Sequence, residues 1–188
     1  KVVEILSKGG IIIYPTDTLY AIGCSIFNQK AIERIAQIKG IHPDKTKFSF
    51  MCYDLSHLSD YCKQIDNNVY KIMRKYLPGP YTFILKANSK VPKILESKRN
   101  TVGIRVPNNN IARVIVHRIG HPIVSTSIKK IDEITEYPTD PEVIYDEYKN
   151  IVDAVIDGGV GGVIPSTVID CSKDEIEVIR EGKGKIDL

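Results

Sequence analysis

The 188-residue sequence has no apolar run that approaches the roughly 20 residues of a membrane-spanning helix, and no signal-peptide pattern opens it. Cysteine is scarce, and the cysteines present lack the CxxC spacing of zinc and redox motifs. They are Cys24, Cys52, Cys62 and Cys171. We expect free, buried thiols in a reducing compartment and therefore a cytoplasmic protein.

The common nucleotide-binding signatures are also missing. The chain has no GxxxxGK[ST] loop, and no GxGxxG follows a predicted strand. The glycine-rich stretch 158–162 follows a predicted strand without a clear helix behind it, so we interpret it as a flexible hairpin turn rather than a phosphate loop. The four histidines are dispersed without metal-ligand spacing, and no metal site is predicted.

Length and composition are those of one globular domain with a substantial core, since 43% of the residues are hydrophobic and 26% are charged. Apolar periodicity predicts helices over residues 1–9, 29–39, 67–76, 91–95, 111–119 and 140–148. It predicts strands over residues 10–14, 48–53, 81–87, 101–106, 122–127, 152–156, 166–170 and 175–180, the last two as a hairpin. This interleaving predicts a single α/β domain over residues 1–188 with a mixed sheet.

Charge is mild in total but uneven along the chain. The formal net charge is +3, lysines and arginines dominate the first 130 residues, and acidic residues gather between Asp132 and Glu147. This asymmetry allows an anionic ligand on one face, although a solvated surface accounts for most scattered lysines.

The polar stretch of greatest interest follows the first predicted strand. The apolar run Ile11–Tyr14 ends at Pro15 and is followed by Thr16, Asp17 and Thr18. Polar side chains at a strand end are well placed for a ligand, because a rigid scaffold positions them. A Pro-initiated turn whose threonines cap their own backbone explains the same residues without a ligand.

The same pattern recurs at four other strand ends, which carry hydroxyls or arginines beside turn residues. The five instances are Thr16–Thr18, Arg105–Pro107, Ser125–Ser127, Ser166–Thr167 and Arg180–Gly182. If they converge, they form a pocket of hydroxyl donors and two arginines, a donor set that suits phosphate and carboxylate groups. Each also has a structural explanation as a cap, a satisfied core arginine or a turn.

Six ordered motifs resemble those of the YrdC-like family of threonylcarbamoyl-AMP synthases, and they span essentially the whole chain. They are Tyr14–Gly23, Pro78–Leu85, Gly103–Pro107, Ser125–Ser127, Ser166–Asp170 and Ile179–Gly182. The resemblance implies one α/β domain of the YrdC/RibB-like kind, with a twisted, open, mixed sheet flanked by helices around a basic concave cavity.

The resemblance also implies chemistry: ATP, L-threonine and bicarbonate give threonylcarbamoyl-adenylate and pyrophosphate, for modification of a tRNA adenosine. It further implies binding of tRNA or double-stranded RNA. Mg²⁺ is expected with ATP on chemical grounds, although no ligand set for it is identified. Implied substrate-binding residues are Thr16, Thr18 and Arg105; implied nucleotide-binding residues are Lys39, Ser125, Ser127, Ser166 and Arg180, of which Lys39 and Arg180 are the catalytic candidates.

Two departures from the family pattern stand out. Active members carry Lys-x-Arg and Ser-x-Asn where this chain has Ile41 and Lys129 in the last positions, so one guanidinium and one amide are replaced. The chain therefore resembles most the YciO branch. Three hypotheses stay open: a slow or altered synthase, an RNA- or nucleotide-binding module without that chemistry, and an enzyme for another small carboxylate with ATP. Whether the 131–139 loop covers the cavity is a further question that the sequence leaves open.

Overall fold

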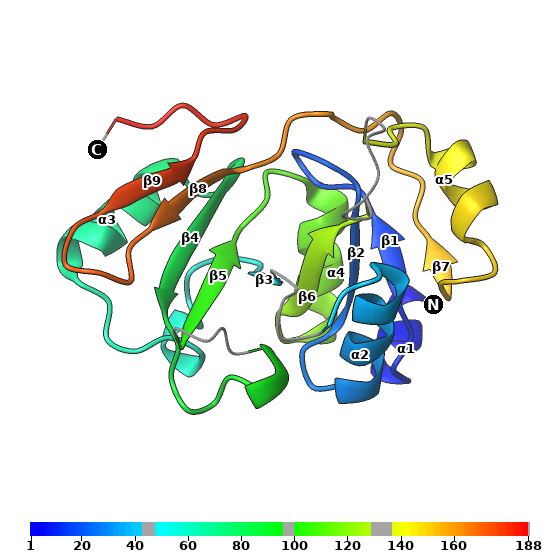
Figure 1. The fold of residues 1–188 in the computed structure, drawn as a ribbon, viewed down its shortest axis with the longest axis horizontal. Helices are drawn as coiled ribbons and strands as arrows, with labels where there is room; N and C mark the ends of the chain where they lie inside the picture. The colour runs from blue at the N-terminus through cyan, green and yellow to red at the C-terminus, as the bar shows by residue number, and fades with distance from the viewer. Residues whose placement is uncertain (43–47, 96–99, 129–136, 188) are drawn as a thin grey trace.

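The computed structural model describes residues 1–42, 48–95, 100–128 and 137–187 of the chain. Its described residues form a nine-stranded sheet with the order β7-β1-β2-β6-β3-β5-β4-β8-β9 (Figure 1). The strands are β1 (Ile12–Tyr14), β2 (Ala21–Ser25), β3 (Ser49–Met51), β4 (Tyr81–Lys86), β5 (Thr101–Arg105), β6 (Ile123–Ser127), β7 (Ala154–Val155), β8 (Thr167–Asp170) and β9 (Glu177–Arg180). Parallel and antiparallel pairs alternate irregularly, which confirms the predicted single α/β domain with a mixed sheet.

The second strand is the main element that the sequence did not predict. All five residues of β2 are buried, and the strand pairs antiparallel with β1 and with β6. The Thr/Asp cluster is therefore the connection of a β1–β2 hairpin. A strand buried on both faces shows no alternation of apolar and polar residues, and Gly23 within it is atypical of strands.

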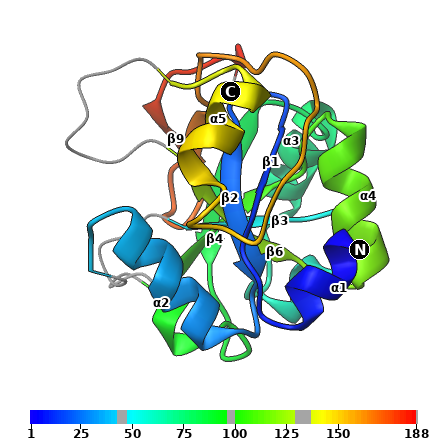
Figure 2. The ribbon, with the colours of Figure 1, turned by 90° about the vertical axis from the view of Figure 1, so that its right-hand side faces the viewer.

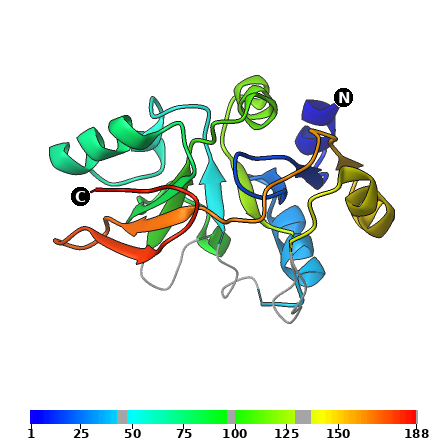
Figure 3. The same ribbon diagram turned by 90° about the horizontal axis from the view of Figure 1, so that it is seen from above.

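Helices cover both faces of the sheet, as Figures 2 and 3 show. Helices α1 (Val2–Ser7) and α4 (Asn110–Ile119) pack on one face, where Leu6 and Ile115 join a cluster with Ile12 and Ile123. Helix α2 (Gln29–Ile38) lies on the opposite face. The larger core cluster combines its Ile32 and Ile35 with Met73 of α3 (Asn67–Tyr76) and with apolar strand residues.

Helix ends follow local rules that the sequence carries. The Asn28 and Asn109 side chains accept hydrogen bonds from the backbone N–H groups of Ala31 and Ala112. The Asp140 side chain caps α5 (Pro141–Tyr148) by accepting a hydrogen bond from the backbone N–H of Glu142. The predicted helix over 91–95 is a shorter 3₁₀ turn, Lys93–Leu95. Lys39 is the C-cap of α2, which fixes the position of its side chain relative to the sheet.

The interpretation of residues 158–162 as a hairpin turn is wrong. They lie in the connection from β7, at one edge of the sheet, to β8, beside the opposite edge (Figure 1). This crossover passes over the β1–β2 turn so closely that a Cβ on Gly162 would lie 2.2 Å from the Thr18 carbonyl oxygen. Glycine is needed there because the two backbones are in contact.

Three of the four thiols are buried, Cys171 is partly buried, and all four are free, as expected. Burial raises the pKa of Cys24 and Cys62 to about 12, so these thiols are protonated at neutral pH and are poor nucleophiles. Within the described ranges, every helix is too short or too polar to cross a bilayer.

Candidate functional site

The turn between β1 and β2 is organised by its own hydroxyls. Thr16 Oγ1 donates to the Leu19 carbonyl at 2.7 Å and accepts from the Thr18 amide at 3.1 Å. The two threonine hydroxyls lie 3.0 Å apart. These contacts are those of a self-capping turn, so the structural explanation of the threonines holds at the local level.

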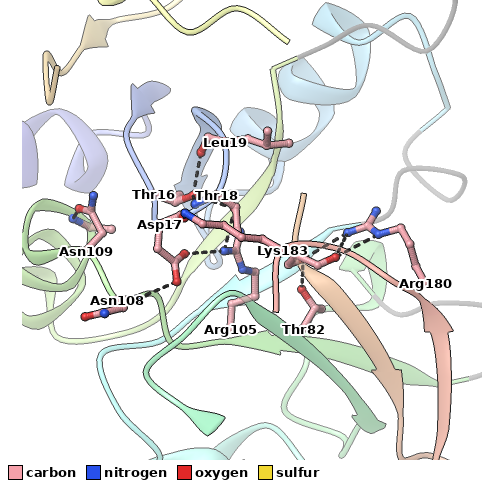
Figure 4. Close-up of polar contacts among 12 residues, drawn as sticks. Thr16, Asp17, Thr18, Leu19, Thr82, Arg105, Asn108, Asn109, Arg180 and Lys183 are labelled. Carbon is pink, nitrogen blue, oxygen red and sulfur yellow. Dashed lines mark hydrogen bonds and ion pairs between the residues drawn. The ribbon is translucent and has the colours of Figure 1, made fainter. Parts of the chain in front are cut away.

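Asp17 and Arg105 form a buried ion pair at the centre of the site (Figure 4). Arg105 Nη2 lies 2.9 Å from Asp17 Oδ1 and donates to Thr18 Oγ1 at 3.0 Å. The other carboxylate oxygen accepts from the Asn108 amide at 3.0 Å. Burial lowers the pKa of Arg105 from its ordinary value, and the Asp17 carboxylate opposes that shift. The end of β5 is thereby tied to the β1–β2 turn.

Only part of the Arg105 guanidinium is satisfied by this pairing. Its Nε is buried without a hydrogen-bond partner among the described residues, and Tyr14 lies within electrostatic range of the guanidinium. A satisfied core arginine would use all its donors, since unpaired buried donors are costly. Arg105 is thus held by one nitrogen, Nη2, and is not fully used by the fold.

A second group of polar residues comes from the other half of the sheet. Arg180, at the end of β9, donates to the Ser166 carbonyl from Nη2 at 2.8 Å and from Nε at 3.1 Å. The Ser166 hydroxyl lies 2.8 Å from the hydroxyl of Thr82 on β4. Partial burial lowers the pKa of Arg180, and Tyr137 rather than a carboxylate acts in the opposite direction. Among the described residues, the hydrogen-bond acceptors of Arg180 are thus the neutral oxygens of Ser166.

Lys183 links the two groups. Its Nζ donates to the Asp17 carbonyl oxygen at 2.5 Å, and Figure 4 shows its side chain between the 16–18 turn and Arg180. Arg105 and Arg180 lie within range for their charges to disfavour one another. The structure therefore brings together Thr16, Thr18 and Arg105 with Ser166 and Arg180, which the sequence proposed as parts of one pocket.

The remaining predicted residues lie on β6 and at the end of α2. Lys39 is buried, and its Nζ donates to the Ser127 carbonyl at 2.6 Å. Ser125 is buried, in register with Gly23 on one side and with Ser49 on the other, and Ser49 is in register with Gly103. These four positions form a row of small residues across the centre of the sheet, on the face that carries Arg105.

Sequence reasoning missed three residues of this arrangement. Asp17 was quoted in the motif but given no role, Lys183 follows the last motif, and Thr82 lies within a strand. The signal for Asp17 was available, because a buried arginine requires an anion and Asp17 is the carboxylate of the first motif. Residues 129–136, which include Lys129 and most of the 131–139 loop, lie outside the described residues.

Two further features of the described residues concern ligand binding: groups of side chains that could hold a metal ion, and cavities. The described residues contain no group of three His, Cys, Asp or Glu side chains that could hold a metal ion. A cavity of about 370 Å³ lies between α5 and β7, and one of about 270 Å³ lies beside α2. Neither is lined by the residues of the arrangement that we call the polar site: Thr16, Asp17, Thr18, Thr82, Arg105, Ser166, Arg180 and Lys183. The concave shape expected of this site stays a prediction.

Comparison of the sequence with known proteins assigns the chain to a family. Residues 4–182 match the Sua5/YciO/YrdC family model, described as "Telomere recombination". The chain belongs to this family. It is 46% identical to the Escherichia coli K12 protein YciO, itself described as uncharacterized, over 99% of this chain and 89% of that protein.

Solved structures agree with the family assignment. The crystal structure of E. coli YciO superposes with a TM-score of 0.89 at 44% identity, over 97% of this chain and 88% of that one. The Pyrococcus abyssi Sua5 structure complexed with L-threonine gives a TM-score of 0.87 at 25% identity, over 96% of this chain and 52% of that one. A Methanocaldococcus jannaschii relative, 35% identical over 97% of this chain and 86% of that protein, is provisionally named threonylcarbamoyl-AMP synthase.

The Asp17–Arg105 pair generates a prediction about stability. Replacing Asp17 by Ala leaves a buried guanidinium without its anion and should lower the free energy of unfolding by about 3 kcal/mol or more. Denaturation in urea measures this change in the free energy of unfolding, and urea is uncharged, so it does not screen the Asp17–Arg105 ion pair. Asp146→Ala is the matched control, because it removes a carboxylate paired to Lys149 at an exposed site and should change little. Equal effects of the two substitutions would show that the central pair is not the anchor described here.

Proposed function

We propose that this Sua5/YciO/YrdC-family chain binds a nucleoside triphosphate with a small carboxylate and joins them by nucleotidyl transfer. ATP and L-threonine are the proposed substrates, with bicarbonate as the carbon source and threonylcarbamoyl-adenylate as the product for tRNA modification. The observation that carries the proposal is the charge balance of the polar site. Among the described residues, Asp17 pairs with Arg105, whereas Arg180 and Lys183 form no ion pair.

The surplus of positive charge favours a polyanionic ligand. Arg180 and Lys183 donate only to neutral oxygens of the described residues, so a phosphate chain would provide the charge that the fold does not. Nucleotidyl transfer depends on such cations, because positioning and electrostatic stabilisation dominate the chemistry at phosphorus. An acid–base residue is less important than donors fixed in advance.

The proposed reaction balances without a redox partner. The amino group of threonine and bicarbonate form a carbamate with loss of water. A carbamate oxygen then attacks the α-phosphorus of ATP, and the bond to the β-phosphate oxygen breaks to release pyrophosphate. Arg180 is proposed to stabilise charge on the phosphates, and Lys39 to act from the β6 side of the site. Mg²⁺ would accompany ATP as its usual counter-ion.

The threonine end of the proposal rests on the Asp17–Arg105 pair and on the relatives. Asp17 fixes Arg105 through Nη2, and Nη1, which makes no hydrogen bond within the part of the chain described, is proposed to bind the ligand carboxylate. The Sua5 structure that matches this fold was solved with L-threonine. Thr16 and Thr18 are proposed to shape the turn that borders the amino acid rather than to take part in chemistry.

The first test follows product formation directly. The protein is incubated with ATP, L-threonine and bicarbonate, and pyrophosphate and an AMP-linked product are measured. Arg180→Ala should reduce turnover by about 100-fold or more, because it removes a fixed donor to developing charge. Arg74→Ala on the exposed surface of α3 is the control and should leave turnover unchanged.

Two results would overturn the proposal. The first is an Arg180→Ala variant that turns over as fast as the control. The second is a wild-type protein that forms no product but binds tRNA or double-stranded RNA with steep salt dependence, which would favour an RNA-binding module. Product with another small carboxylate but not with threonine would keep the nucleotidyl transfer and change the substrate.

The departures at positions 41 and 129 generate a separate prediction. The Ile41 side chain is half-buried beside the end of α2, where a guanidinium would add a bidentate donor near Lys39. Restoring the family pattern with Ile41→Arg and Lys129→Asn together should raise synthase turnover at saturating ATP by about tenfold or more. Ile94→Arg, a half-buried aliphatic position on the Lys93–Leu95 turn, controls for a general effect of added charge. A double variant no faster than wild type would show that these two positions do not limit the rate.

A further inference from the structure

We propose that Lys183 is a phosphate-binding residue of the polar site, which contacts the polyphosphate chain of the nucleotide. This inference rests on the proposed function, because it names a residue that binds part of its substrate. Lys183 lies beyond the last sequence motif, and no resemblance assigns it a role. The argument uses three observations: the fixed backbone of residue 183, the direction of its ammonium group and the charge around it.

Hydrogen bonds hold the C-terminal segment 181–187 against β4 and β8, so the backbone position of Lys183 is fixed. The Lys183 amide donates to the Pro165 carbonyl at 2.8 Å, and the Gly182 amide donates to Thr167 Oγ1 at 3.0 Å. The Tyr81 hydroxyl donates to the Lys185 carbonyl at 2.6 Å. Contacts on both sides of residue 183 therefore determine where its side chain starts.

The backbone at Gly182 also lies in close contact with the backbone of Pro165 and Ser166. A Cβ on Gly182 would lie 2.3 Å from the Pro165 carbonyl oxygen and 2.5 Å from the Ser166 carbonyl carbon. The 180–183 turn thus wraps closely around residues 165 and 166. Arg180 donates to the Ser166 carbonyl and the Lys183 amide donates to the Pro165 carbonyl, and Figure 4 shows the Lys183 side chain between the 16–18 turn and Arg180.

The ammonium group of Lys183 is anchored by one donor and has two more to offer. An ammonium carries three N–H donors. One donates to the Asp17 carbonyl oxygen at 2.5 Å, and the side chain makes no other hydrogen bond or ion pair with the residues that the structure describes. The side chain is exposed to solvent, so a ligand can approach the two remaining donors.

Lys183 forms no ion pair with the residues that the structure describes. Its acceptor is the carbonyl of Asp17, while the carboxylate of the same residue is paired with Arg105 and the Asn108 amide. Arg180, three residues earlier in the chain, donates to neutral oxygens of Ser166. Two cations that form no ion pair with the described residues favour a ligand that carries several negative charges, and lysine binds phosphate as a point charge.

A purely structural role for Lys183 makes a different prediction. If its only task is to hold the 16–18 turn through the Asp17 carbonyl, its loss should weaken every ligand of the site, including the amino acid. If it contacts phosphate, its loss should weaken ligands in proportion to their phosphate chain. A series of ligands that differ only in phosphate number separates the two roles.

The experiment measures dissociation constants of AMP, ATP, inorganic pyrophosphate and L-threonine by calorimetry for three variants. Lys183→Met removes the charge and keeps the aliphatic stem, Lys183→Arg keeps the charge, and Lys185→Met is the matched control on the same exposed segment. Lys183→Met should weaken ATP and pyrophosphate about tenfold and reduce the salt dependence of ATP binding. AMP should be weakened much less than ATP, threonine should bind as to the control, and Lys183→Arg should retain most of the ATP affinity.

A second measurement uses the wild-type chain and does not depend on any variant. Acetylation of Lys183 and Lys185 is followed by mass spectrometry with and without pyrophosphate. Pyrophosphate should slow acetylation of Lys183 several-fold and leave Lys185 unchanged. Equal protection of the two lysines would contradict a direct contact.

The outcomes distinguish this inference from the proposed function. Wild-type protein that binds neither ATP nor pyrophosphate rejects both. Wild-type protein that binds ATP, with Lys183→Met equal to Lys185→Met, rejects only the role of Lys183. Equal weakening of AMP, ATP and L-threonine by Lys183→Met also rejects it and assigns Lys183 to the turn.

Discussion

The buried ion pair between Asp17 and Arg105 is the interaction on which the site depends. Arg105 ends β5 and Asp17 lies in the turn between β1 and β2, and the sheet order places β6 and β3 between that hairpin and β5. A desolvated guanidinium is costly, so its anion has to be supplied at a fixed position. The hydroxyl of Thr18 and the amide of Asn108 complete that position. The β1–β2 turn is thus fixed by charge as well as by its own hydrogen bonds.

Two long connections bring the other half of the sheet to this anchor. The crossover from β7 to β8 runs against the turn at Gly162 and delivers Ser166, while the segment after β9 returns to it through Lys183. Residues from opposite ends of the chain therefore border the same carboxylate-containing turn. Backbone contacts rather than side-chain packing decide how closely these segments approach, which explains why glycines occupy the points of contact.

The sequence predicts much of this arrangement where local rules decide it. Helix caps such as Asn28 and Asp140 and the β8–β9 hairpin follow from residue type and spacing, and the ordered motifs identify the family. The sequence does not predict β2, because complete burial removes the alternation that marks a strand. It also does not reveal that residues 158–162 cross the molecule, since a glycine-rich stretch suits a tight turn and a close backbone crossing equally well.

The site residues, too, are only partly predictable from the sequence. Arg105 and Arg180 are recognisable in the sequence because they interrupt or end strands, yet their electrostatic roles differ only in the folded chain. Arg105 has an internal anion and is mainly held by the fold, whereas Arg180 and Lys183 have neutral acceptors. A cation that the fold already neutralises contributes orientation, and a cation that it leaves unneutralised contributes affinity for an anion. Arg180 and Lys183 are far in the sequence from positions 41 and 129, so the proposed anion binding does not use the two donors that the family pattern has at those positions.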